Sequence, residues 1–232
     1  MLEDEGGKSF LNNVISAPNE TNLHFHGLHI SGELPSDDTS LVIAPGDSYT
    51  YTIRLPHDHM PGTHWLHPHR HGSSALQVGG GAVLAVIVED DDTNQSPPAS
   101  IQALPEQTLV VHDLNIRELD KLSSRGEGTL WSRASLLESN NLPTRYYTVN
   151  GQLEPTVTLQ AMQWTRMRIV WAAWRAGNLD WTIQDTASCS LQLLSKDGIY
   201  VRNFPREIDM APIVPGGRAD VLVNCPTAGS FS

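Results

Sequence analysis

The sequence predicts an all-β protein whose strands pack as β-sandwiches, and two observations support this. Apolar and β-branched residues alternate with polar residues over short runs, as they do in strands with one buried face. Proline, glycine, asparagine and aspartate separate these runs, whereas helix signals are few. Many short strands divided by turn residues are typical of sandwich folds.

The expected strands follow these runs in chain order. After the turn at 44–47, Tyr49, Tyr51 and Ile53 alternate with polar residues, which predicts a half-buried strand. The segment 114–122 is expected to be a short helix or a loop. Further strands are expected at 23–30, 63–69, 82–89, 107–113, 156–160, 166–173, 191–195 and 218–224.

At 232 residues the chain has room for one large domain or for two ordinary domains. Between 89 and 99, an aspartate run and then Asn-Gln-Ser-Pro-Pro replace the strand pattern, which indicates a link. We therefore expect a first domain at 1–95 and a second at 96–232. The second is expected to be incomplete, since the last residues break off where another strand should follow.

Charge and hydropathy exclude several classes of partner. The formal net charge is −11 with only 15 lysines and arginines, so no nucleic-acid or anionic membrane surface is expected. No apolar run is long enough to cross a bilayer, so no membrane partner is expected. The first residues lack the pattern of a secretory signal, which leaves the compartment open.

Two short histidine clusters are the strongest functional signal in the chain. Alternate side chains of a strand share a face, so His24 points with His26, and His67 points with His69. Two such strands side by side would present four imidazoles. Imidazole suits copper, zinc, iron and nickel, and no carboxylate alternates with these histidines. We therefore expect these four residues to bind copper or zinc.

Residues around these clusters are expected to have mostly structural roles. His64 has the opposite parity to His67, so its side chain should face away from the metal and pack. Trp65 has the same parity as His67 and should line the metal pocket. His71 shares the parity of His69, but the strand is expected to end before it. The loop histidines at 57 and 59 are expected in a solvated turn, with an auxiliary metal site as the alternative.

Cysteine usage leaves one question open. Cys189 and Cys225 are the two cysteines of the chain, and neither has a histidine nearby in sequence. Their spacing is compatible with a disulfide and equally with two separate, buried, small side chains.

The motifs resemble those of the multicopper oxidases, the laccase-like family built from cupredoxin domains. The copper signatures are His-x-His-Gly at 24–27 and Gly-Thr-x-Trp-x-His-x-His at 62–69. Val-Asn-Gly-Gln at 149–152 and Pro-Gly-Gly-Arg-Ala-Asp-Val at 215–221 resemble the family's middle domain. The resemblance covers about residues 20–225, and it implies two consecutive cupredoxin-like Greek-key β-sandwich domains, shortened at both ends relative to the family.

The resemblance also implies an activity and a set of ligands. His24 would bind a type 2 copper, and His26, His67 and His69 would bind a type 3 pair, which is half of a trinuclear site. Such an enzyme couples oxidation of a phenol or similar reducing substrate to reduction of dioxygen, and a secreted or periplasmic location is expected. The type 1 signature, His-Cys-His, is lacking, since no histidine follows His112. Oxidase activity would then need a partner or a missing segment.

Two alternatives remain at this point. A shortened cupredoxin-like protein with zinc or copper at the half-site could perform non-redox, hydrolytic chemistry at an open coordination position. A noncatalytic metal-binding module is the other alternative, in which a homo-oligomer brings two half-sites together.

Overall fold

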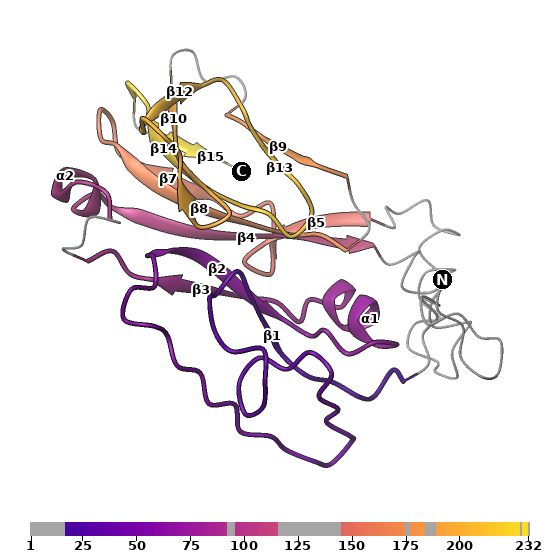
Figure 1. Ribbon diagram of the computed structural model, residues 1–232. Coiled ribbons are helices and arrows are strands. Elements are labelled where there is room, and N and C mark those ends of the chain that lie inside the picture. Colours follow the sequence, from indigo (N-terminus) through magenta and orange to yellow (C-terminus); the bar gives the residue numbers. More distant parts are fainter. Residues whose placement is uncertain are drawn as a thin grey trace, which may run out of the picture.

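The computed structural model describes residues 17–91, 96–115, 145–174, 177–183, 189–227 and 229–231, and strands dominate them, as expected (Figure 1). The first elements are β1 (His24–His26), β2 (Gly62–His67), α1 (Ser74–Gly79), β3 (Leu84–Val88) and α2 (Ala99–Gln102). The rest are β4 (Glu106–Asn115), β5 (Arg145–Val149), β6 (Gln152–Leu153), β7 (Val157–Leu159), β8 (Thr165–Ala172), β9 (Leu179–Trp181), β10 (Ser190–Lys196), β11 (Ile199–Tyr200), β12 (Arg206–Ile208), β13 (Ala211–Ile213), β14 (Arg218–Asn224) and β15 (Gly229–Phe231). No helix among these residues is long and apolar enough to span a membrane.

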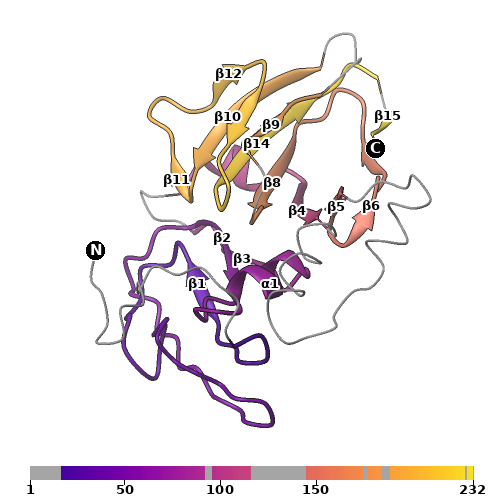
Figure 2. The ribbon, with the colours of Figure 1, turned by 90° about the vertical axis from the view of Figure 1, so that its right-hand side faces the viewer.

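The described strands form a small three-stranded sheet, a large eight-stranded sheet and two two-stranded sheets, and the small sheet lies against the large one (Figure 2). The small sheet is antiparallel, in the order β1-β2-β3. The large sheet has eight strands in the order β11-β10-β14-β8-β4-β5-β6, with β12 added beside β10. Its β4 and β8 run parallel, whereas its other pairs are antiparallel. In Figure 1, β2 and β3 lie below β4, while β9 and β13 lie above β5.

The main apolar core lies between the large sheet and two two-stranded sheets, β9–β13 and β7–β15. All eight residues of β8 are buried, because both faces of this strand are covered. Its residues Met167, Ile169 and Trp171 belong to this core. Val170 and Ala172 point to the other face and pack against Trp65 of β2. The large sheet is therefore the middle layer of the molecule.

Charged side chains also lie buried between the small and the large sheet. Arg166 of β8 forms an ion pair with Asp220 of β14. The distance between Nη2 of Arg166 and Oδ2 of Asp220 is 2.6 Å. The hydroxyl of Thr63 in β2 donates to the other oxygen of Asp220 at 2.6 Å. Arg168 lies 2.9 Å from Glu106 and 3.3 Å from Asp220. Each buried charge thus has partners, which such a location requires, since an unpaired buried charge costs several kcal/mol.

Some expected elements differ from the structure. The segment 49–54 alternates in exposure as predicted but is not a strand, because it has no ladder partner among the described residues; the Thr52 amide donates to the carbonyl of Pro35 instead. The prediction of a helix or loop from 114 is wrong for Leu114 and Asn115, which continue β4, and 116–122 lie outside the described residues. The short helices α1 and α2 were not predicted.

The structure answers the question about the cysteines. Cys189 and Cys225 form a disulfide that joins chain segments 36 residues apart, and the described part of the chain has no free cysteine. Cys225 lies in the main core, and Cys189 packs against it.

Removing this disulfide should lower stability. Replacement of both Cys189 and Cys225 by alanine removes a cross-link that restricts the unfolded chain, at a cost of about 2–4 kcal/mol. Urea unfolding of the metal-free protein, with the wild type under reducing conditions as a second comparison, measures this change. An unchanged free energy of unfolding would contradict the prediction.

Candidate metal centre

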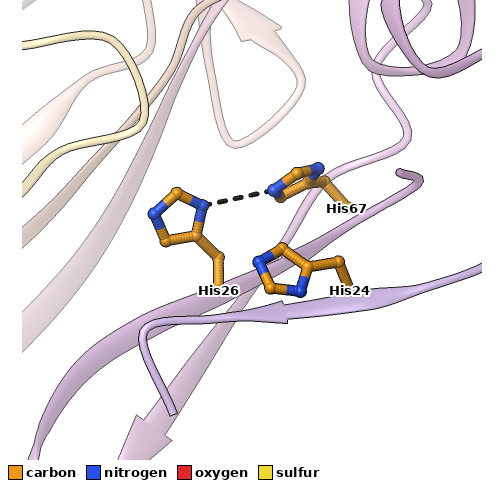
Figure 3. Close-up of side chains that lie close together, drawn as sticks. All are labelled: His24, His26 and His67. Carbon is orange, nitrogen blue, oxygen red and sulfur yellow. Dashed lines mark hydrogen bonds between the residues drawn. The ribbon is translucent and has the colours of Figure 1, made fainter. Parts of the chain in front are cut away.

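The pairing of β1 with β2 brings the two histidine clusters together. In the antiparallel register, His24 lies opposite His67, and His26 lies opposite Trp65. The imidazole nitrogens of His24, His26 and His67 form one group in which the three potential ligand atoms lie within 4.8 Å of one another (Figure 3). The Nδ1 atom of His26 lies 3.2 Å from the Nε2 atom of His67. Three of the four predicted residues therefore converge on one point.

The fourth predicted residue, His69, lies beside this group but is not part of it. Its ring centroid is 5.2 Å from that of His24 and 5.8 Å from that of His67. Its backbone amide donates to the side chain of Asn22 at 2.7 Å, and Asn22 is itself fully buried. The Nδ1 atom of His69 is buried and has no hydrogen-bond partner among the described residues. This nitrogen is free to bind a metal ion.

Hydrogen bonds orient two of the imidazoles. The Nδ1 atom of His24 lies 2.9 Å from a carboxylate oxygen of Asp37, whose other oxygen accepts from the amide of Phe25. The Nδ1 atom of His67 lies 3.0 Å from the carbonyl oxygen of Pro68. Because both oxygens act as acceptors, each Nδ1 donates and each Nε2 keeps its lone pair. Such contacts are typical of histidines that bind metals.

Burial favours the neutral form of three imidazoles, those of His26, His67 and His69. It lowers the pKa of His26 to about 3, with the positive charge of Arg218 as the next cause, and it lowers the pKa of His67 to about 4. Burial also lowers the pKa of His69. Neutral imidazole is the form that ligates a metal, and a cluster of imidazoles suits copper or zinc. The donor set therefore fits copper.

The neighbouring histidines have other surroundings. The ring of His64 packs between Gly27 and Gly198, near His59, and neither ring nitrogen has a hydrogen-bond partner among the described residues. The Nε2 atom of His59 accepts a hydrogen bond from the backbone amide of His29. His71 is exposed, and His112 is hydrogen-bonded to the carbonyl of Val78 at 2.8 Å.

Several residues that shape this site could not be found from the sequence. Asp37 lies in an irregular segment, and Asn22 precedes the first signature, so neither has a spacing that marks it. Gly216 and Arg218 belong to a recognised motif, but nothing in that motif indicates that they contact the histidine strands.

Comparison with known proteins is consistent with this geometry. Residues 7–93, which contain both histidine clusters, match the multicopper oxidase family model. This part of the chain therefore carries a domain of the multicopper oxidase family. The chain is 24% identical over 207 residues to the iron transport multicopper oxidase fetC of Epichloe festucae, covering 88% of this chain and 30% of that protein.

Solved structures of multicopper oxidases share the fold. A multicopper oxidase from Pseudomonas parafulva is 27% identical with a TM-score of 0.63, covering 94% of this chain and 48% of that one. The blue copper oxidase from Nitrosomonas europaea is 24% identical with a TM-score of 0.63, covering 92% and 61%. The chain thus spans only part of the length of its relatives. The fold is a cupredoxin-type β-sandwich, and the family binds copper.

The buried His64 should make stability depend on pH. Burial, with the nearby charge of Arg218, lowers its pKa to about 4, whereas the unfolded chain has a pKa of about 6.5. Below pH 6.5 the unfolded state binds a proton that the folded state does not bind until about pH 4, so stability falls as the pH falls. This residue should account for a loss of about 2 kcal/mol between pH 7 and pH 5.

Urea unfolding of the metal-free protein at these two pH values tests this prediction. His64→Phe keeps a flat ring without a titrating group, so its stability should fall by about 2 kcal/mol less than that of the wild type. Equal losses in the two proteins would show that His64 does not titrate as described.

Proposed function

We propose that this chain carries half of a trinuclear copper centre of a multicopper oxidase. His24 is the proposed type 2 ligand, and His26, His67 and His69 are the proposed type 3 ligands. The observation that supports this most is the convergence of three imidazoles from two paired strands, with the ring of His69 beside them. The family match over residues 7–93 favours copper over zinc and an oxidase over a hydrolytic role.

In this proposal, the protein's own residues prepare the site for the metal. The Asp37 carboxylate and the Pro68 carbonyl hold His24 and His67 in the tautomer whose Nε2 carries no proton. The indole of Trp65, which is 3% exposed, covers His26 and His67 and keeps water from that side. Copper, when bound, would supply the redox chemistry that reduces dioxygen.

Multicopper oxidases use dioxygen and reducing substrates such as phenols or metal ions. We propose that this chain serves the same reaction with a phenol or similar substrate, and that 1–95 and 96–232 are its two cupredoxin-like domains. A type 1 copper needs a cysteine thiolate. Both cysteines of this chain are joined in a disulfide, so that thiolate must come from another segment or polypeptide.

Copper content per chain tests the proposal. After copper loading and desalting, elemental mass spectrometry should find at least one copper in the wild type and a clear loss when His24 and His67 are replaced by alanine. His71→Ala is the matched control, because His71 is exposed and lies outside the converging group. It should keep the copper of the wild type.

Two outcomes would reject the copper proposal. One is that the wild type retains no copper after desalting. The other is that it holds one zinc per chain that copper cannot displace.

A further inference from the structure

A turn joins β13 to β14, which is a strand of the large sheet, and this turn contacts His26 of the small sheet. Gly216 in this turn has a φ of +79°, and a Cβ atom added to it would lie 3.3 Å from Cε1 of His26 and 3.7 Å from Cζ2 of Trp65. The backbone of the turn therefore packs directly against one proposed copper ligand. A side chain at this position would press on the imidazole.

Trp65 connects the same turn to a second proposed ligand. Its indole lies 5.1 Å from the ring of His26, in a stacked arrangement, and 4.3 Å from the ring of His67. Its Nε1 atom donates to the carbonyl oxygen of Gly216 at 3.2 Å. Apolar side chains of the neighbouring strand β3 and of β4 and β8 in the large sheet pack around the indole. Both imidazoles thus rest on a ring whose position depends on Gly216.

Arg218 links the turn to β2 through hydrogen bonds. Its guanidinium is buried and donates from Nη1 to the Gly216 carbonyl at 3.3 Å and from Nε to the Thr63 carbonyl at 3.1 Å. Two backbone hydrogen bonds also join the turn to β8, from Gly216 to Trp171 and from Trp171 to Gly217. The turn is therefore hydrogen-bonded to strands of both sheets.

We propose that Gly216, Trp65 and Arg218 are positioning residues that set the orientation of His26 and His67 for copper. They are not ligands, and they act through packing and through the shared Gly216 carbonyl. The inference rests on the proposed function, because it concerns the affinity and geometry of that copper site. It also states that the large sheet, which carries none of the four histidines, helps to form the site.

The test compares two glycine variants of the full chain. Gly216→Ala adds a methyl group beside His26 at a positive φ. Gly151→Ala is the matched control, because Gly151 has nearly the same φ of +77° but nothing within 4 Å of its Cβ position. Both variants carry similar backbone strain, and only one presses on an imidazole.

Copper affinity is measured by competition with a chelator, and the copper environment by electron paramagnetic resonance. Gly216→Ala should weaken copper binding by about 10- to 100-fold, as loss of supporting contacts commonly does, and should change the spectrum. Gly151→Ala should match the wild type in both. If Gly216→Ala also matches the wild type, the inference is overturned.

Two further measurements keep the test decisive. If Gly216→Ala fails to fold, Trp65→Phe removes the hydrogen bond to Gly216 and keeps an aromatic ring; an unchanged affinity and spectrum would then overturn the inference.

If the wild type binds no copper, the proposed function fails, and nuclear magnetic resonance of the metal-free imidazoles decides the inference alone. The nitrogen signals of His26 and His67 should shift in Gly216→Ala and not in Gly151→Ala; equal spectra would overturn it.

Discussion

The register between β1 and β2 determines which imidazoles meet. His24 lies opposite His67, and successive residues of a strand point to opposite faces, so a slip of one residue would separate the two clusters. The alternation within β2 also puts three side chains on one face of this strand. Thr63 bonds to Asp220, Trp65 bonds to Gly216, and His67 joins the imidazole group. One face of β2 therefore contacts the large sheet, and the last residue on this face, His67, belongs to the candidate metal site.

The contact between the sheets is partly polar, which has consequences for its geometry. Apolar packing tolerates small shifts, whereas a buried carboxylate between two guanidinium groups needs particular distances and angles. Asp220 accepts from Thr63, Arg166 and Arg168. We infer that this network sets the position of β2 against β14. It thereby also positions the turn at Gly216 beside His26.

Much of the fold and part of the site could be predicted from the sequence. Strand alternation located β14 at 218–224 and predicted that His24 and His26 share one face, and both belong to the converging group. The contacts of Asp37 and Gly216 could not be predicted, because they depend on how distant segments pack and not on local spacing. The strand expected at 49–54 failed for a related reason: side-chain alternation indicates exposure, but a strand also needs a backbone partner.

The central claim is that imidazoles from both strands take part in binding copper. Pulsed electron paramagnetic resonance of protein loaded with one equivalent of copper, with histidine labelled by ¹⁵N, counts the imidazole nitrogens directly bound to the metal. The account predicts that imidazoles of both strands contribute to the spectrum, so that intensity is lost in His24→Ala and also in His67→Ala. A spectrum unaffected by either substitution would contradict it.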